Sequence, residues 1–336
     1  MTASLDRRLC VAPMMDWTDR HCRYFHRLLA PRALLYTEMV HAAAIVRGDG
    51  ARLLAHDPHE RPLALQLGGS DPQELARAAA IGAMHGFDEI NLNCGCPSPR
   101  VQRGRFGACL MAEPERVAAG VAAMVAALPA TLPVTVKCRI GIDDSEEFDF
   151  LARFVEHVAA AGSATFVVHA RKAWLRGLSP KQNREVPPLR YPVVHRLKRS
   201  FPALRIVLNG GLSRPSQALA ELAHVDGVMI GREAYQNPWS LTEFHAALYP
   251  GAAPAPSRTA VLARMAAYAA AQQRNGVPLH AVTRHLLGLF NGVPGARAWR
   301  RQLALAGPED VPDRLLAAAM PVGIEPARAE PALTVR

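Results

Sequence analysis

A cysteine in a short turn is the residue best suited to chemistry in this 336-residue chain. Cys96 lies between Gly95 and Pro97, a sequence that would present its thiol on a tight exposed turn. A zinc site shared with Cys94 is disfavoured, because zinc sites usually separate cysteines by about two to four residues and need two further ligands. A nucleophilic role would need a base such as His169, whereas an unperturbed thiol is mostly protonated near pH 7 and can act as a general acid. We therefore predict a proton donor at Cys96, a structural Cys94 and no bound metal.

Two glycine-containing segments, Asn209-Gly210-Gly211 and Gly231-Arg232, have the composition of a phosphate site. Their backbone N–H groups would be free of Cβ obstruction, and Arg232 would add a guanidinium group. Asn-Gly-Gly alone is more often only a turn. The two segments predict phosphate binding if the fold brings them together.

Three further side chains, Lys137, His169 and Gln66, are suited to the ring of a flavin. A lysine can stabilise the anionic reduced ring, and an amide or imidazole can bond its pyrimidine edge. Pro13-Met14-Met15 would supply an apolar, polarizable surface for the ring. Each residue also has an ordinary structural explanation, since lysines at strand ends often snorkel to the surface. Their meeting at one site would favour bound FMN.

These polar residues follow apolar segments that alternate with helical periodicity as far as about residue 245. Eight strands, each followed by a crossover, predict an α/β fold of the (β/α)8 TIM-barrel type, with its active site at the carboxyl ends of the strands. A doubly wound sheet shows the same alternation, but no GxGxxG follows the first strand and no P-loop occurs. The expected strands are Leu9–Pro13, Ala33–Glu38, Leu63–Leu67, Glu89–Asn93, Val134–Cys138, Thr165–His169, Arg205–Asn209 and Gly227–Ile230.

A segment rich in proline, alanine and glycine marks a change to purely helical patterns. After it, Ser257 is a suitable N-cap for a helix that ends at Asn275-Gly276. Further helices are expected over roughly 278–291, 294–306 and 312–320, which would form a small helical bundle. We predict four parts: a catalytic barrel domain over 1–248, a linker over 249–256, a helical domain over 257–322 and a flexible tail over 323–336.

The charge balance favours a polyanionic partner, because 39 Lys and Arg outnumber 29 Asp and Glu and give a formal charge of +10. Between Phe244 and Pro308 there is no Asp or Glu but there are seven arginines, which phosphate contact explains better than a merely solvated surface. Arg297, Arg300 and Arg301 would share one helix face. The cysteines show no secreted-protein spacing, and neither a signal peptide nor a membrane-spanning run is found. We expect a soluble, cytoplasmic protein without membrane association.

Taken together, the longer motifs resemble the dihydrouridine synthases. They are APMMDWTDRHCRYFHR, INLNCGCPSPRVQRGRFGACLM, VKCRIGID, VVHARKAWLRGLSPKQNREVPPL, LNGG and GVMIGREAYQNPW. The run HARKAWLRGLSPKQNR is similar to the DusA branch of that family. The resemblance extends from about Leu9 to near Leu316, and so covers nearly the whole chain.

The resemblance implies an enzyme that reduces uridine in the D-loop of tRNA, at U20 or U20a, to 5,6-dihydrouridine. It implies that NADPH reduces FMN, that flavin N5 gives a hydride to uracil C6, and that Cys96 protonates C5. Cys94 departs from the aliphatic residue more common in the family, which puts no role in doubt. The implied FMN ligands are Pro13, Met14, Met15, Gln66, Lys137, His169, Asn209, Gly210, Gly211, Gly231 and Arg232.

The uracil must leave the folded tRNA to reach such a pocket, so grip on the surrounding RNA is also expected. Asn93 is the expected hydrogen-bond partner of the base, and Arg171 would help to orient it. No protein partner is implied. The residues expected to contact the D-loop and elbow of tRNA are Lys181, Arg184, Arg297, Arg300 and Arg301.

Two other functions remain open at this point. An FMN barrel that acts on a free pyrimidine, as dihydroorotate and dihydropyrimidine dehydrogenases do, would share the flavin site but has no need of the acid-free arginine segment. A non-catalytic RNA-binding protein would explain the charge, but not Cys96, Lys137 and His169 at one barrel mouth. Flavin absorbance would distinguish the non-catalytic RNA-binding protein from both enzymes. Dependence on tRNA would distinguish the uridine-reducing enzyme from the one that acts on a free pyrimidine.

Overall fold

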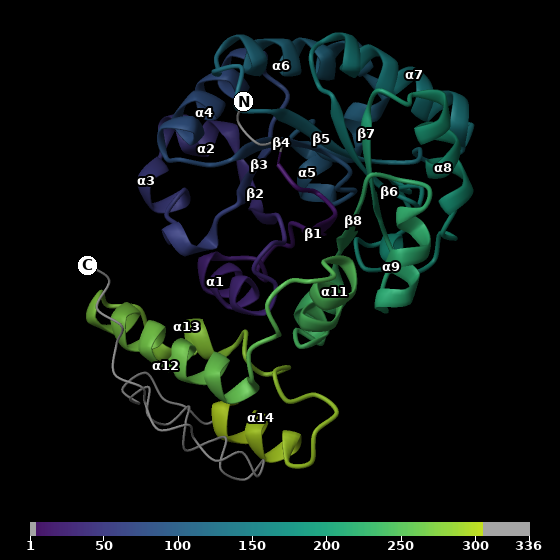
Figure 1. The fold of residues 1–336 in the computed structure, drawn as a ribbon. Coiled ribbons are helices and arrows are strands. Elements are labelled where there is room, and N and C mark those ends of the chain that lie inside the picture. The colour runs from purple at the N-terminus through teal and green to yellow at the C-terminus, as the bar shows by residue number, and fades with distance from the viewer. Residues whose placement is uncertain (1–4, 305–336) are drawn as a thin grey trace.

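Eight parallel strands form a single sheet in the order β1-β8-β7-β6-β5-β4-β3-β2 in the computed structural model, which describes residues 5–304. Hydrogen bonds from Val11 N–H to Leu34 O at 3.0 Å and from Leu34 N–H to Leu9 O at 2.9 Å bring the two edges together. The sheet is therefore a nearly closed barrel, and the predicted fold class is confirmed (Figure 1). The strands are β1 (Leu9–Val11), β2 (Leu35–His41), β3 (Leu63–Gly68), β4 (Glu89–Cys94), β5 (Val134–Arg139), β6 (Thr165–His169), β7 (Arg205–Asn209) and β8 (Gly227–Ile230).

Helices surround this barrel, and α4 (Pro72–Met84) is one of those that begin at a capping residue. Asp71 accepts a hydrogen bond from Glu74 N–H, and Pro72 occupies the first turn of the helix that follows. The helices of the barrel portion are α1 (Arg20–Leu29), α2 (Ala42–Arg47), α3 (Gly50–Leu53), α4 (Pro72–Met84), α5 (Pro99–Arg103), α6 (Pro114–Ala126), α7 (Glu147–Ala160), α8 (Tyr191–Ser200), α9 (Pro215–Leu222), α10 (Arg232–Gln236) and α11 (Ser240–Leu248). Three short 3₁₀ helices join them: η1 (Pro58–Glu60), η2 (Gly107–Ala112) and η3 (Gln182–Arg184).

The barrel interior is partly apolar and partly a buried polar network. Glu89, at the start of β4, accepts hydrogen bonds from Tyr36 Oη at 2.7 Å and Thr135 Oγ1 at 2.6 Å, and it pairs with Arg7 at 2.6 Å. Asn91 donates to Thr135 Oγ1 at 2.8 Å. The apolar part is a small cluster inside the ring, formed by Cys10, Ala12, Leu34, Tyr36, Ala64, Val167, Val207 and Met229. Because these buried polar groups have partners, the strands can carry polar residues inward at low cost.

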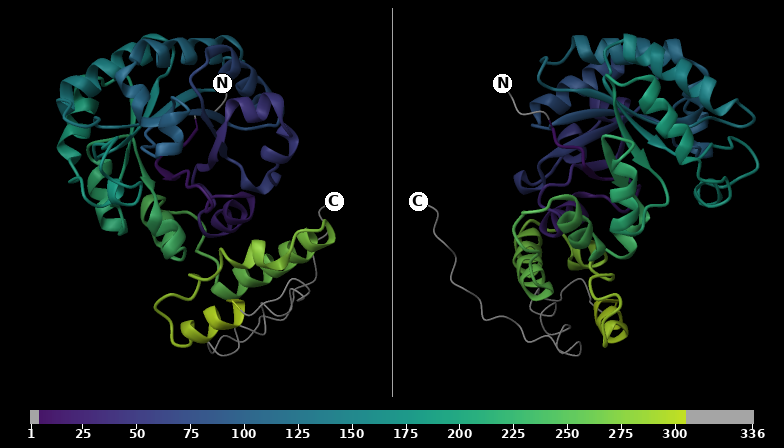
Figure 2. Two further views of the ribbon diagram at one scale, coloured as in Figure 1. Left: turned by 180° about the vertical axis from the view of Figure 1, so that it is seen from behind. Right: turned by 45° about the vertical axis from the view of Figure 1, so that its right-hand side comes forward.

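Within residues 5–304, three helices follow the barrel: α12 (Arg258–Arg274), α13 (Leu279–Thr283) and α14 (Ala296–Ala304). Figures 1 and 2 show them together outside the ring, next to α1. Ser257 caps α12 by accepting from Ala260 N–H, as expected. Tyr268 stacks on Tyr24 of α1, with ring centroids 4.0 Å apart. In the described residues no helix is long and apolar enough to cross a membrane.

The prediction of one helix over 278–291 was wrong. Only α13 forms there, and turns lead from it to α14. A Cβ at Gly288 would lie 2.6 Å from Pro238 Cδ and 2.8 Å from Gln236 O, so the chain at this point is pressed against the end of α10. Close packing thus overrides the helical pattern, while Leu286 O accepts from Trp299 Nε1 at 2.9 Å. The helix expected over 312–320 and the tail lie outside the described residues.

Candidate active site

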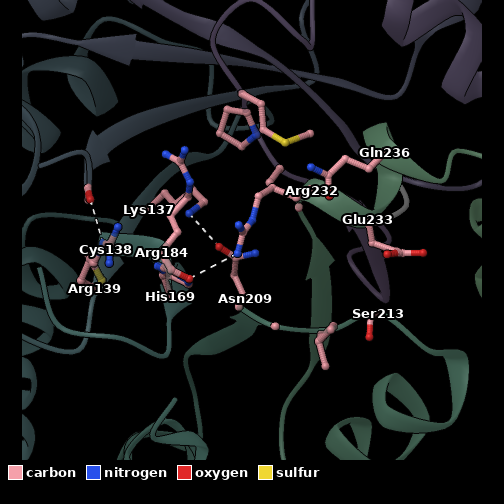
Figure 3. A pocket seen from close by; sticks show the side chains of 18 residues that line it. Lys137, Cys138, Arg139, His169, Arg184, Asn209, Ser213, Arg232, Glu233 and Gln236 are labelled. Atoms are coloured by element: carbon pink, nitrogen blue, oxygen red, sulfur yellow. Dashed lines mark hydrogen bonds between the residues drawn. The ribbon is translucent and has the colours of Figure 1, made fainter. Parts of the chain in front are cut away.

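Two cavities adjoin at the carboxyl ends of the strands. The first, about 420 Å³, is bordered by Asn209, Gly210, Gly211 and Gly231, and we call it the glycine cavity (Figure 3). The second, about 470 Å³, is bordered by Cys96, and we call it the Cys96 cavity. The residues that line both are Pro13, Met14, Gly95, Lys137, Arg139, Arg184 and Arg232. The fold therefore brings the two predicted groups, phosphate-type and thiol, into one continuous site.

Glycines shape the wall of the glycine cavity. Gly210 and Gly211 have φ angles of +119° and +72°, in the left-handed region that favours glycine. A Cβ at Gly210 would lie 2.6 Å from His169 Cδ2, whereas one at Gly231 would meet no atom within 4 Å. Backbone at Gly231 thus borders open space, and the Gly210-Gly211 turn lies directly against His169. Together they form a cradle that admits a ligand close to the main chain.

Lys137 and Asn209 join neighbouring parts of this wall. Lys137 Nζ donates to Asn209 Oδ1 at 3.0 Å, and Asn209 Nδ2 donates to Met229 O at 2.8 Å. Burial, with a smaller contribution from Arg139, lowers the pKa of Lys137 to about 8. Burial and then the same guanidinium lower the pKa of His169 well below its usual value. His169 is therefore a neutral imidazole at pH 7, with one nitrogen able to donate and one able to accept.

Arg232, expected to bind phosphate, is paired with a carboxylate in this structure. Its Nη1 contacts Glu185 Oε1 at 2.7 Å, and its Nη2 donates to Arg184 O at 3.3 Å. The pair links the start of α10 to the segment that follows β6, at the edge of both cavities. The guanidinium thus lies where an anionic group is already bound.

The side chain of Asn93 holds the turn that carries Cys96. Asn93 Oδ1 accepts from Gly95 N–H at 3.1 Å and from Cys96 N–H at 3.0 Å, while Asn93 Nδ2 donates to Gln66 Oε1 at 2.9 Å. Cys96 is half-buried and borders its cavity. Cys94 is fully buried, and burial raises the pKa of its thiol well above the usual value. Only the second cysteine of the pair can therefore reach a bound molecule.

Gln66 and Asn93 continue the buried network of the barrel to its mouth. Gln66 Nε2 donates to Asn91 Oδ1 at 2.8 Å, and Asn91 leads through Thr135 to Glu89. Both amides nevertheless border the Cys96 cavity. The contacts give Asn93 a positioning role for the cysteine turn, in addition to the predicted contact with a base.

Two residues that hold the same turn were not predicted. Arg139 Nε donates to Gly95 O at 3.0 Å, and Gln102 Nε2 donates to Pro97 O at 2.8 Å. Arg139 is 4% exposed, borders both cavities, and has its pKa lowered to about 10 by burial. Its sequence signal was available, because it lies two residues after Lys137 and so on the same side of β5. Gln102, on α5, carries no such signal.

The residues expected to contact RNA are divided between the mouth and the surface. Arg184 lines both cavities, and Lys181 is exposed on the same segment. Arg171 lines neither cavity: it donates to Glu185 O and Pro187 O and so braces this segment. The three arginines of α14 are exposed, whereas Trp299 and Leu303 of that helix are buried. The described residues contain no group of three His, Cys, Asp or Glu side chains able to hold a metal ion.

Comparison with known proteins identifies the family. The sequence model of the family described as Dihydrouridine synthase (Dus) matches residues 10–320. The chain belongs to the dihydrouridine synthase family. The match extends through α12, α13 and α14, and the resemblance read from the sequence motifs is confirmed.

Individual relatives in the dihydrouridine synthase family are identical to this chain at more than half of the aligned residues. The tRNA-dihydrouridine(20/20a) synthase of Xanthomonas axonopodis pv. citri is 60% identical over 309 residues, which cover 90% of this chain and 91% of that protein. The protein of the same name from Shewanella oneidensis is 56% identical over 301 residues, covering 90% and 89%. That of Vibrio cholerae is 54% identical over 298 residues, covering 88% and 90%.

A solved structure supports the barrel fold alone. A 2-naphthoyl-CoA reductase in complex with 2-naphthoyl-CoA aligns with a TM-score of 0.53 at 9% identity, covering 70% of this chain and 49% of that one.

Proposed function

We propose that this chain is an FMN-dependent tRNA-dihydrouridine synthase that uses NADPH to reduce the C5=C6 bond of D-loop uridines, at U20 and U20a. Three relatives that are 54–60% identical along about nine-tenths of the chain carry the name tRNA-dihydrouridine(20/20a) synthase. The observation that carries the proposal is the continuity of the glycine cavity with the Cys96 cavity through Lys137. A cofactor-type wall and a proton donor thus face one space.

The residues present fit an FMN molecule. The open space at Gly231 and the turn at Gly210-Gly211 suit a phosphate, which backbone N–H groups can bind. The phosphate would replace Glu185 on Arg232, one anion for another. Lys137 and the neutral His169 would face the polar edge of the ring, and Met14 would pack against its apolar part. When bound and reduced by NADPH, FMN supplies the hydride that is added to C6 of the uracil.

The protein's own contribution to the reaction is a proton and its placement. The Cys96 thiol gives its proton to C5 of the uracil, so that hydride at C6 and proton at C5 together complete the addition across the double bond. Asn93, through the N–H groups of Gly95 and Cys96, fixes the thiol relative to the ring. Arg139 fixes the same turn from the opposite side through Gly95 O.

The surface charge supports an RNA substrate. Arg184 at the cavity edge and the exposed arginines of α14 would contact phosphates on either side of the extruded uridine. An oxidoreductase for free pyrimidines would leave these exposed arginines without a role. It would also leave unexplained why no Asp or Glu occurs between Phe244 and Pro308.

The test is the reduction of unmodified tRNA by the purified protein loaded with FMN and supplied with NADPH. We expect dihydrouridine at U20 and U20a. A Cys96→Ala protein should lose about 10²- to 10⁴-fold in rate, because the proton for C5 is missing, while NADPH still reduces its flavin. Cys94→Ala, the matched control, should remain largely active.

Three results would contradict the proposal. Protein that binds no FMN under reconstitution would remove the cofactor. Reduction of free uridine as efficient as that of tRNA would favour a small-molecule oxidoreductase. Loss of activity in Cys94→Ala but not in Cys96→Ala would remove the assigned proton donor.

A further inference from the structure

A stacked aromatic pair lies at the edge of the Cys96 cavity and has no part in the reaction described above. Trp17, from the segment between β1 and α1, stacks on Tyr235 of α10 with ring centroids 4.4 Å apart and planes 7° from parallel. Trp17 also lines the cavity, together with Cys96 and Met15. Tyr235 thus covers one face of the indole, and Trp17 lies at the space into which the target base must enter.

The turn that presents Trp17 is firmly built. Asp16 has a φ of +63°, which is uncommon for a residue other than glycine, and its N–H donates to Glu38 Oε1 at 2.5 Å. Thr18 Oγ1 accepts from Met14 N–H at 2.9 Å, and Trp17 N–H donates to Met14 O at 3.1 Å. A strained conformation that is held by several contacts indicates a surface whose position matters.

Two basic residues, Arg284 and His285, lie beyond the aromatic pair. Tyr235 meets His285 edge-on, with centroids 5.7 Å apart. Asp19 is bound by both His285 and Arg284, at 3.0 and 2.5 Å, so its negative charge is compensated next to the platform. A flat aromatic surface with a basic side chain nearby is an arrangement that single-stranded nucleic acids recognise, because every base has a π face and every nucleotide a phosphate.

We propose that Trp17 is a stacking platform for the nucleobase that adjoins the target uridine in the RNA strand. When the uridine leaves its stack, the neighbouring base loses a stacking partner, and the Trp17 indole replaces it at the cavity edge. Stacking accepts purines and pyrimidines alike, so this contact positions the strand and does not read its sequence. The inference rests on the proposed function, because it requires an RNA substrate with an extruded uridine.

The experiment compares wild type with Trp17→Leu and Trp17→Phe on three versions of one tRNA: intact, abasic on the 5′ side of the target uridine, and abasic on its 3′ side. On intact tRNA, Trp17→Leu should lower kcat/KM for dihydrouridine formation on the order of tenfold, mainly through KM. Trp17→Phe, which keeps a ring, should recover most of this loss. On one of the two abasic tRNAs, wild type and Trp17→Leu should have equal kcat/KM, because the base that stacks is gone.

The matched control is Tyr24→Leu, which removes the stacked pair Tyr24–Tyr268. That pair also joins α1 to α12 but borders neither cavity, so the variant should show the same kcat/KM as wild type on all three RNAs. An equal loss for Trp17→Leu on every RNA would reveal a purely structural brace and overturn the platform. No loss on intact tRNA would overturn it as well. A wild-type protein that forms no dihydrouridine would overturn both proposals, whereas an active wild type without a Trp17 effect would overturn this one alone.

Discussion

Lys137 shows how burial can bring the pKa of a lysine into a range where its charge changes with modest changes in pH. The amine lies inside the barrel mouth, where burial lowers its pKa to about 8, so a substantial fraction is neutral at mildly alkaline pH. Its hydrogen-bond acceptor Asn209 is uncharged and the nearby Arg139 is positive, so neither favours the ammonium form as a carboxylate would. The electron-rich edge of a bound ligand would stabilise the ammonium form of Lys137.

The affinity for FMN should therefore depend on pH. Below about pH 8 Lys137 is already protonated in the ligand-free protein, and the affinity should be constant. Above that pH the binding of FMN must also take up a proton, so the affinity should fall as pH rises, by up to about tenfold per unit. Titration of FMN-stripped protein by flavin fluorescence from pH 6.5 to 9.5 measures this.

Two variants complete the pH measurement. Lys137→Met should bind FMN more weakly at pH 7 and lose the decline above pH 8. Lys172→Met removes an ammonium group that bonds Ser145 O outside both cavities, and it should titrate like wild type. A decline that persists in Lys137→Met would assign the titration to another group.

Among the elements, α1 has the most consequential terminus. Asp19 caps it by accepting from His21 N–H at 2.9 Å and Cys22 N–H at 3.0 Å. The same carboxylate binds Arg284 and His285, which follow α13. These hydrogen bonds and the nearby cations outweigh burial and hold the pKa of Asp19 far below its usual value. One residue thus joins a barrel helix to the helices that follow the barrel.

Asp19→Ala should lower the free energy of unfolding by about 2–3 kcal/mol, because it removes a helix cap and leaves a charged partner without its hydrogen bonds. Since the folded pKa lies below the unfolded one, this contribution is complete at pH 7 and disappears only as pH falls through the folded pKa. Urea unfolding at pH 7 measures it. Asp71→Ala removes a cap of α4 whose side chain accepts from Glu74 N–H, and it should cost about 1 kcal/mol. Equal losses in the two variants would show that the contacts to Arg284 and His285 contribute nothing.

At the scale of the whole molecule, the charge is unevenly distributed along the chain. The formal charge is +10, and the stretch from Phe244 to Pro308 carries arginines without a single acid. In α14, buried Trp299 and Leu303 fix the helix, which leaves its arginines in solvent. Arg300 also donates to Asn291 Oδ1 at 2.9 Å. Such a face can bind phosphates without rearrangement of the fold.

Replacing Arg297, Arg300 and Arg301 together by Ala should weaken tRNA binding and flatten its dependence on salt. The slope of log K against log salt should change by about 0.7 to 0.9 per lost phosphate contact. FMN occupancy and flavin reduction by NADPH should be unchanged, since these occur in the barrel. A salt series of binding measurements beside a melting curve tests this.

The control removes three arginines, and so the same number of charges, from helices that surround the barrel. Arg77 of α4, Arg153 of α7 and Arg199 of α8 are all exposed. Their triple replacement should leave the slope close to that of wild type. Similar slopes for the two triple variants would mean that only net charge matters, and the α14 face would then not be part of the RNA site.

Local sequence patterns determined the elements and their order. Three of the eight predicted strands, Thr165–His169, Arg205–Asn209 and Gly227–Ile230, have the observed bounds. Asp71 and Ser257 cap the helices that they were expected to begin. Apolar alternation and capping act within a few residues of the chain, so the sequence alone carries this information. The rule that parallel strands present their carboxyl ends at one mouth then placed Lys137, His169 and Asn209 together.

Only the tertiary structure decided which residues distant in the sequence contact one another. Asn93 holds the Cys96 turn while it bonds Gln66, and Arg232 is paired with Glu185. Trp17 finds Tyr235 because barrel closure brings β1 beside β8. The helix expected over 278–291 shortens because Gly288 must approach Pro238. Each of these depends on the distance between chain segments after closure, and that distance is a property of the packed barrel, which no local periodicity encodes.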